Sequence, residues 1–265
     1  MNHDSASDER LILRANVHFV LARPQFLGNI GAVARVMKNF GFFSLRLIDP
    51  PRNYKDAEAR KMSVGAFDVL KQATVFTTLD AALADIGIAI GTTSGRQRAE
   101  NCILAQELST RLSGISDQDQ IALIFGDERD GLRGDELKRC HCVLTIPTQP
   151  ELPSLNVAQA LGIVAYELVR AGSIKSADCK QDERHGSPKE PKNDSRSILA
   201  TGADVDEIFG QIGALFDAAE FSRAYNRQLV LAELRSAFQR MLPTKRECDL
   251  IKGALIRLNQ KLSQE

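Results

Sequence analysis

The chain has 265 residues, of which 43% are apolar and 26% charged, and its 34 basic residues balance its 34 acidic ones. This composition is ordinary for a globular protein and excludes collagen-like and low-complexity chains. The five cysteines are odd in number and scattered, unlike a secreted disulfide framework, and no run reaches the roughly 20 apolar residues of a membrane span. We therefore expect a cytoplasmic protein without a membrane segment.

The first 170 residues predict alternating strands and helices. Val17–Ala22 is typical of a buried strand, and apolar residues then recur at helical spacing up to Phe40, with Asn29 as N-cap and Gly41 as the stop. This alternation predicts an α/β fold with a mostly parallel sheet and flanking helices. The further predicted strands are 45–48, 75–76, 86–90, 121–125 and 143–146, and the further helices 66–72, 79–83, 135–139 and 155–170.

The pattern changes after the last of these helices. Only three of the 26 residues at 172–197 are apolar, too few to bury a core, so we expect a flexible polar linker over 172–199. Beyond it we expect a helical RNA-binding module at 200–265. Thr244 and Glu247 have capping-box spacing, and residues 221–262 carry nine Lys or Arg against three acids. The remaining parts are a disordered extension at 1–16 and the main domain at 17–171.

Small and polar residues follow four predicted strands, at 23–29, 92–98, 126–131 and 147–156. Ligands bind beyond the carboxyl ends of strands in open α/β sheets, so these segments form the candidate site. The sequence lacks the glycine fingerprint of dinucleotide-binding folds and the phosphate-binding P-loop, which excludes both classes.

A metal site at Cys140, His141 and Cys142 is not expected. Alternate residues of a strand point to opposite faces, so these three side chains cannot converge on one ion. Packing at the edge of a strand explains them instead.

Three segments follow one another in the candidate site: Leu27–Arg35, Ile124–Leu132, and Ile146–Thr148 with Leu152–Ala160. In this order they resemble the motifs of RNA 2′-O-ribose methyltransferases of the SPOUT superfamily. The basic helical tail resembles that of the tRNA-modifying TrmJ branch. One departure is Asp127, where the family often has a basic residue or proline; an acid there could repel phosphate.

The resemblance implies a C-terminal trefoil knot, a homodimer and S-adenosylmethionine as cofactor. Carried over by position, it also assigns site residues. The cofactor-binding residues are Thr92, Thr93, Ser94, Gly126, Ile146, Pro153, Ser154 and Leu155. The catalytic residues are Arg35, Asn29, Ser154 and Asn156. The RNA-binding residues are Arg23, Arg96, Arg98 and Glu128.

Ordinary structural roles compete with several of these assignments. Asn29 is also a plain N-cap, Ser154 and Asn156 also suit a helix start, and Arg35 also suits a solvated helix face. Because arginine is a poor base in water, we favour a role in which Arg35 grips a phosphate and polarises the hydroxyl, with proton abstraction as the alternative.

The implied function is methylation of a ribose 2′-hydroxyl in tRNA, in the anticodon loop at position 32 as in the TrmJ branch. One alternative is the same reaction on ribosomal RNA. Another is a non-catalytic RNA-binding protein on the same fold, which the acidic Asp127 and the neutral net charge favour.

Overall fold

A computed structural model describes residues 12–94, 101–113, 115–170, 174–175, 198–219, 221 and 226–262. Its centre is a sheet of seven parallel strands, in the order β4-β3-β2-β7-β5-β8-β6. The strands are β2 (Val17–Ala22), β3 (Ser44–Ile48), β4 (Thr74–Phe76), β5 (Ile88–Thr93), β6 (Cys102–Leu104), β7 (Ile121–Phe125) and β8 (Cys142–Thr145).

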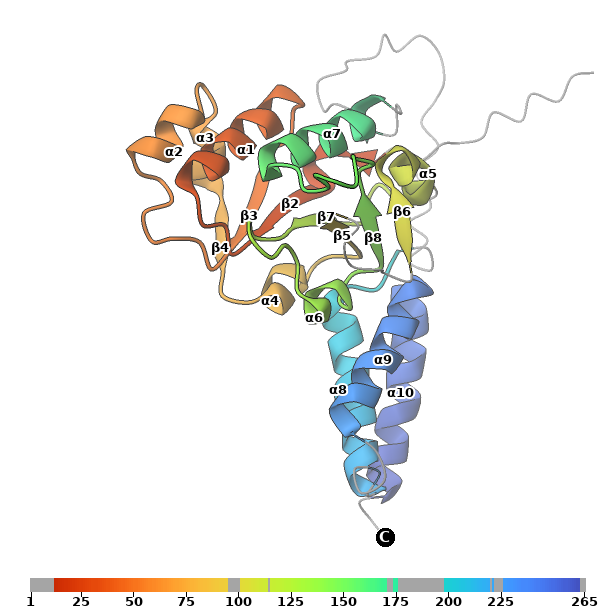
Figure 1. Ribbon diagram of the computed structural model, residues 1–265. Helices are drawn as coiled ribbons and strands as arrows, with labels where there is room; N and C mark the ends of the chain where they lie inside the picture. The colour runs from red at the N-terminus through yellow and green to blue at the C-terminus, as the bar shows by residue number, and fades with distance from the viewer. Residues whose placement is uncertain are drawn as a thin grey trace, which may run out of the picture.

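Helices cover both faces of this sheet. The two sides of β2 illustrate this coverage. Phe19 lies in one apolar cluster with Met37 and Leu161, while its neighbour Val20, which points to the opposite face, lies in a second cluster with Leu79. A strand covered on both faces reads as a continuous apolar run, as the sequence of β2 does. One face carries α1 (Leu27–Asn39), α2 (Ala57–Met62), α3 (Phe67–Gln72), α5 (Leu108–Leu112) and α7 (Val157–Arg170), and the other α4 (Leu79–Leu83) and α6 (Gly134–Leu137) (Figure 1).

The predicted α/β fold is confirmed, with differences at the ends of elements. The strand predicted at 86–90 runs on to Thr93, because Thr92 and Thr93 pair with β8 although they are polar. The helix α2, the strand β6, the turn η2 (Ala105–Glu107) and α5 were not predicted, since each spans only three to six residues. A short 3-10 turn, η1 (Arg14–Asn16), precedes β2.

A helical module follows the sheet domain and projects from the face that carries α4 and α6 (Figure 1). It consists of α8 (Gly202–Ala218), α9 (Arg227–Arg240) and α10 (Lys245–Leu262). The expected capping box at the start of α10 is confirmed, because Thr244 Oγ1 accepts from the Glu247 amide at 3.3 Å and Glu247 Oε2 accepts from the Thr244 amide at 2.7 Å.

Hydrogen bonds from main-chain groups attach this module to the sheet domain. The Gly202 amide donates to the Ile86 carbonyl at 3.1 Å, and a Cβ at Gly202 would lie 2.5 Å from the Leu83 carbonyl oxygen. The Leu199 amide donates to Asp119 at 2.9 Å, and the Leu199 side chain is buried. Leu199, at the end of the predicted linker, is therefore part of the packed structure.

Two short segments lie side by side where an extension and a linker were predicted. The backbone of β1 (Ile12–Leu13) pairs in parallel with β9 (Ile174–Lys175). Residues 1–11 and 176–197 lie outside the described residues. The domain boundaries and the trefoil knot stay predictions. None of the helices described is both long and apolar enough to cross a bilayer.

The close approach at Gly202 predicts the effect of adding one methyl group there. Gly202→Ala should lower the free energy of unfolding by about 1–3 kcal/mol, because a Cβ cannot fit against the Leu83 carbonyl. Gly210→Ala is the control in the same helix, since a Cβ there meets nothing within 4 Å. It should stabilise the protein by about 0.5–1 kcal/mol. Urea unfolding of both variants tests this, and equal effects would refute it.

Two buried histidines predict that stability falls with acid. Burial lowers the pKa of His141 to about 4, and burial also lowers the pKa of His18. Each stays neutral in the folded chain but takes up a proton near pH 6.5 once unfolded. Their contribution is therefore complete above that pH and falls in acid, and that of His141 is lost as the pH falls towards 4. At pH 5 the loss due to His141 should be about 2 kcal/mol.

Urea unfolding at pH 5 and 7.5 measures this loss. His141→Asn is the control, because its side-chain oxygen can still accept the Ala89 amide, which donates to His141 Nδ1 at 3.0 Å, yet it does not titrate. An unchanged pH dependence in His141→Asn would show that the histidine is not responsible.

Candidate functional site

A cavity of about 600 Å³ opens at the carboxyl ends of β5, β7 and β8. This is the edge at which ligands bind in open parallel sheets, and the volume suits a small-molecule ligand. All eight residues expected to bind a cofactor line it, and so do Asn29, Glu128 and Asn156. Its lining also includes Phe26, Phe125, Asp127, Arg129, Asp130, Gly131, Leu132, Leu144, Val157 and Ala160.

The wall after β7 is a tight loop, which we call the cavity loop (residues 126–131). Its two ends touch, because the Gly131 amide donates to the Asp127 carbonyl at 3.1 Å. A Cβ at Gly126 would lie 2.0 Å from the Gly131 carbonyl carbon, and Gly131 has φ +70°. Glycine is therefore required at both ends of the loop, for close approach at one and for left-handed backbone at the other.

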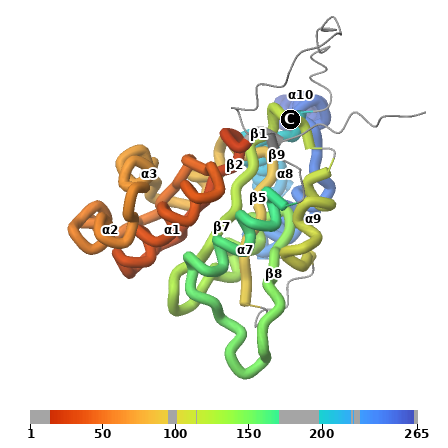
Figure 2. The backbone as a smooth tube through the Cα atoms, turned by 90° about the horizontal axis from the view of Figure 1, so that it is seen from above, coloured from red at the N-terminus to blue at the C-terminus, as the bar shows by residue number. Residues whose placement is uncertain are grey.

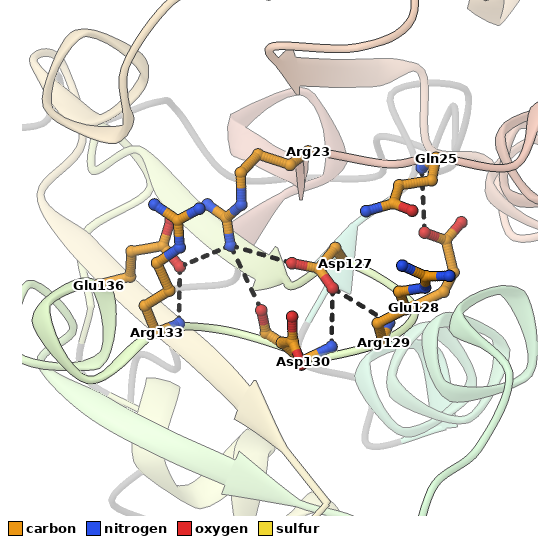
Figure 3. Close-up of polar contacts among 9 residues, drawn as sticks. Arg23, Gln25, Asp127, Glu128, Arg129, Asp130, Arg133 and Glu136 are labelled. Atoms are coloured by element: carbon orange, nitrogen blue, oxygen red, sulfur yellow. Dashed lines mark hydrogen bonds and ion pairs between the residues drawn. The ribbon is translucent and has the colours of Figure 1, made fainter.

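Asp127, the acid that departs from the family pattern, points into the protein. It is 8% exposed, and its Oδ1 accepts the amides of Arg129 at 3.0 Å and Asp130 at 2.8 Å. Its Oδ2 accepts from Arg23 at 3.3 Å (Figure 3). Burial raises the pKa of Asp127, but these two amides and Arg23 outweigh it and hold the pKa below its ordinary value. The carboxylate is thus ionised and compensated, which removes the expected repulsion of phosphate.

Glu128 joins the cavity loop to the start of α1. Its carboxylate accepts the amides of Gln25 at 3.0 Å and Phe26 at 3.3 Å, and the Asn29 side-chain amide at 2.9 Å. Free amides and the helix dipole make a helix start favourable for a carboxylate. Glu128 had been expected to bind RNA, and here its two oxygens are occupied within the chain.

The prediction of Asn29 as N-cap is wrong. The helix begins at Leu27, its N-cap position is Phe26, and no side chain caps it there. Glu128 accepts the two amides before the helix instead, and it also accepts from Asn29 Nδ2. The Asn29 Oδ1 accepts from Asn156 Nδ2 at 2.9 Å, so the two asparagines bridge α1 and the start of α7.

Asn156 has a structural role as well as its place in the cavity. Its Oδ1 accepts the Ala158 amide at 2.9 Å, which caps α7. α7 starts at Val157 and not at the predicted Leu155, so Ser154 and Leu155 lie in the loop before it. Ser154 is exposed and lines the cavity, and Thr148 Oγ1 stabilises the loop by donating to the Pro153 carbonyl at 3.0 Å.

The remaining arginines of the expected site lie elsewhere. Arg35 is exposed on α1, does not line the cavity, and has no hydrogen-bond or ion-pair partner among the described residues. Arg23 is bound to Asp127 and Glu136. Arg96 and Arg98 lie outside the described residues.

Several cavity residues were missed by the sequence analysis. Arg129, Asp130 and Leu132 belong to the second motif, so their neighbours in the sequence could have indicated them. Phe26 and Leu144 carried no signal, because an apolar residue at a strand end also suits the core. Within the described residues, no group of acidic, histidine or cysteine side chains could hold a metal ion, and Cys140, His141 and Cys142 are all buried.

A parallel sheet with a ligand cavity at its carboxyl edge, built from loops of three consecutive motifs, defines a ligand-binding α/β domain. The chain belongs to the SpoU rRNA methylase family, whose model matches residues 16–166. It is 31% identical over 247 residues to the tRNA (cytidine/uridine-2′-O-)-methyltransferase TrmJ of Yersinia pestis, covering 93% of this chain and 92% of the relative.

Similarity extends across the helical module as well. The protein of the same name from Sodalis glossinidius is 33% identical over 242 residues, covering 91% of this chain and 90% of the relative. The crystal structure of TrmJ from Zymomonas mobilis (Z. mobilis ZM4) superposes with a TM-score of 0.73 at 28% identity, covering 91% of this chain and 98% of that one. The sheet domain and the module therefore occur together in related proteins.

The contact at Gly126 predicts a loop that cannot accept a side chain. Gly126→Ala should lower the free energy of unfolding by about 1–3 kcal/mol, because the new Cβ would overlap the backbone of Gly131. Gly134→Ala is the control, since a Cβ there meets nothing within 4 Å. Thermal unfolding and amide exchange at residues 126–132 measure the effect. A loop equally protected in both variants would contradict this account of the cavity.

Proposed function

We propose that this chain methylates a ribose 2′-hydroxyl of tRNA with S-adenosylmethionine as the methyl donor. The observation that carries the proposal is the cavity itself, because all eight expected cofactor residues line it. Its support is the match, over nearly the whole chain, to relatives named as tRNA (cytidine/uridine-2′-O-)-methyltransferases. Position 32 of the anticodon loop is the target that the TrmJ branch suggests, and an enzyme acting on tRNA there would work in the cytoplasm.

The residues of the cavity suit S-adenosylmethionine. Leu144, Ile146 and Leu155 offer apolar surface for an adenine ring, while backbone groups near Gly126 and hydroxyls such as Ser94 offer polar contacts. The absence of a Cβ at Gly126 lets the backbone of Gly131 pack against it, which keeps the loop that lines the cavity compact. When bound, S-adenosylmethionine supplies an activated methyl group, so the protein's own task is to orient the hydroxyl and ease its loss of a proton.

Arg35 is the residue we assign to that task. Its exposed guanidinium, with no partner among the described residues, can make a forked contact with an RNA phosphate and polarise the neighbouring hydroxyl. Asn29, Asn156 and Ser154 would position the ribose, since all three line the cavity and the asparagines hold each other at 2.9 Å.

A homodimer reconciles the position of Arg35 with this role. Arg35 does not line the cavity of its own chain, so it would act at the cavity of a second copy. α1 and α7 lie side by side over the sheet (Figure 2) and expose Ile163 and Tyr166 of α7, and Phe26 is exposed just before α1. A two-fold contact through this surface would bury these side chains.

The helical module would supply RNA affinity. α10 exposes basic side chains, Arg246, Arg257 and Lys261 among them, and phosphate contacts of this kind dominate nucleic-acid affinity. Ribosomal RNA is the second candidate substrate, because the family model that matches is that of an rRNA methylase. A non-catalytic RNA-binding protein is the remaining alternative.

Transfer of labelled methyl groups to total RNA separates these possibilities. We expect label in tRNA, and mapping of the modified ribose identifies the position. Label confined to ribosomal RNA would support the second candidate. Binding of S-adenosylmethionine and RNA without transfer would support the non-catalytic alternative, and failure to bind S-adenosylmethionine with or without RNA would refute the proposal.

The role of Arg35 predicts a catalytic defect without a structural one. Arg35→Ala should lower the single-turnover rate at saturating cofactor by roughly 100-fold or more, and leave cofactor binding and the thermal unfolding midpoint unchanged. Arg35→Lys should rescue little, because an ammonium lacks the planar fork. A wild-type rate in Arg35→Ala would make this arginine a solvated helix residue.

Mixing two variants tests whether sites are shared between copies, because Arg35→Ala removes the arginine and Gly126→Ala is expected to disrupt the loop that lines the cavity. A heterodimer of Arg35→Ala and Gly126→Ala pairs one intact cavity with one intact arginine. Equal mixing should therefore restore about one quarter of wild-type activity, since half of the dimers are mixed and each has one good site. No restoration, with mixed dimers demonstrated, would place Arg35 and the cavity of a working site in the same chain.

A further inference from the structure

An ion cluster of Arg23, Asp127 and Glu136 links the end of β2, the cavity loop and α6 (Figure 3). The strands β2 and β7, which the cluster's first two residues follow, are neighbours in the sheet, and the chain reverses its direction of strand addition between them. Arg23 follows β2 directly in left-handed backbone, with φ +51°, and its side chain is 18% exposed. An unusual backbone conformation is thus maintained at the residue that reaches the loop.

Arg23 fixes both ends of the cavity loop at once. Its Nη2 donates to Asp127 Oδ2 at 3.3 Å and to the Gly131 carbonyl at 3.4 Å. Asp127, in turn, holds the middle of the loop through the amides of Arg129 and Asp130. One guanidinium therefore ties the whole loop to the end of β2.

Glu136 fixes Arg23 from the other side. Its Oε2 accepts from Arg23 Nη2 at 3.0 Å and from the Arg133 amide at 2.7 Å, and its Oε1 accepts from Arg23 Nη1. The side chains of Asp127 and Glu136 are 6% and 10% exposed. With two nearly buried carboxylates in contact, the charge of Arg23 is already compensated, so it is poorly suited to bind an RNA phosphate.

We propose that Arg23 is a positioning residue, which through Asp127 and Glu136 sets the shape of the cavity loop and thereby the affinity for S-adenosylmethionine. This inference rests on the proposed function and replaces the expected RNA contact of Arg23. The loop supplies one wall of the cavity, and its first residue, Gly126, packs directly against its last, Gly131. A displacement of about 1 Å in such a wall costs up to roughly 100-fold in binding or rate.

Titration calorimetry with S-adenosylmethionine tests the inference on the full chain. Arg23→Ala should weaken binding by about 10- to 100-fold and raise KM for the cofactor, while kcat at saturating cofactor changes by less than about threefold. Arg133→Ala is the matched control, because it removes the same charge from the same region. Its backbone amide still binds Glu136, and its side chain makes no hydrogen bond to the cavity loop among the described residues. It should bind like the wild type.

Asp127→Asn distinguishes the ion pair with Arg23 from the turn that Asp127 stabilises. The substitution removes the negative charge, but the side-chain oxygen can still accept the amides of Arg129 and Asp130. It should weaken cofactor binding, and should add little when combined with Arg23→Ala, because both break the same link. It also keeps the inference testable if Arg23→Ala does not fold. All measurements are made well below each unfolding midpoint, so that a loss of stability alone does not change the affinity.

Three outcomes would overturn the inference. The first is wild-type cofactor affinity in folded Arg23→Ala, or in Asp127→Asn if Arg23→Ala does not fold. The second is a fully additive effect of the two substitutions on cofactor affinity. The third is a loss of tRNA affinity without a loss of cofactor affinity. The last would restore Arg23 as an RNA contact. If the wild-type chain itself does not bind S-adenosylmethionine, the proposed function fails instead.

Discussion

The arrangement of the site depends on one carboxylate, that of Glu128, placed at the start of α1. It accepts two main-chain amides and one side-chain amide from the segment between β2 and α1. The helix dipole adds a favourable field for a negative charge at this end of α1. The interaction therefore joins the first and second motifs, which are about 100 positions apart in the sequence.

Two adjacent acids in the cavity loop face opposite ways and connect it to different elements. Glu128 reaches α1, whereas its neighbour Asp127 reaches Arg23 at the end of β2. The loop is thus held from both sides, while Gly126 allows its two ends to pack against each other. The third motif joins the same network, because Asn156 caps α7 and binds Asn29. The cavity is shaped by contacts among polar side chains that few substitutions could reproduce.

The sequence predicted the central strands well, because β2 and β7 are apolar runs with no competing pattern. The eight residues that the resemblance assigned to the cofactor all line one cavity, since parallel strands end at the same edge; that they bind a cofactor stays a prediction. The prediction of Asn29 as N-cap was wrong, because capping propensity depends only on the local sequence. The donors just before α1, and the Asn29 side chain itself, instead bind Glu128, which comes from a loop distant in the sequence. The sequence could not reveal that Asp127 and Arg23 compensate each other, since residues 104 positions apart show no pairing in a single sequence.

The joint between the sheet domain and the helical module has a consequence for how such proteins diversify. At the start of α8 the joint consists of backbone amides and carbonyls at the corner between α4 and β5, together with the missing side chain of Gly202. Backbone groups are common to every residue type. This part of the joint therefore constrains the path of the main chain far more than it constrains which amino acids occur there. A different helical module could be joined at the same corner if it kept a glycine there and replaced the side-chain contacts, such as that of Asp119 with the Leu199 amide, that complete the joint. A sheet domain joined in this way can carry different recognition modules at the same position.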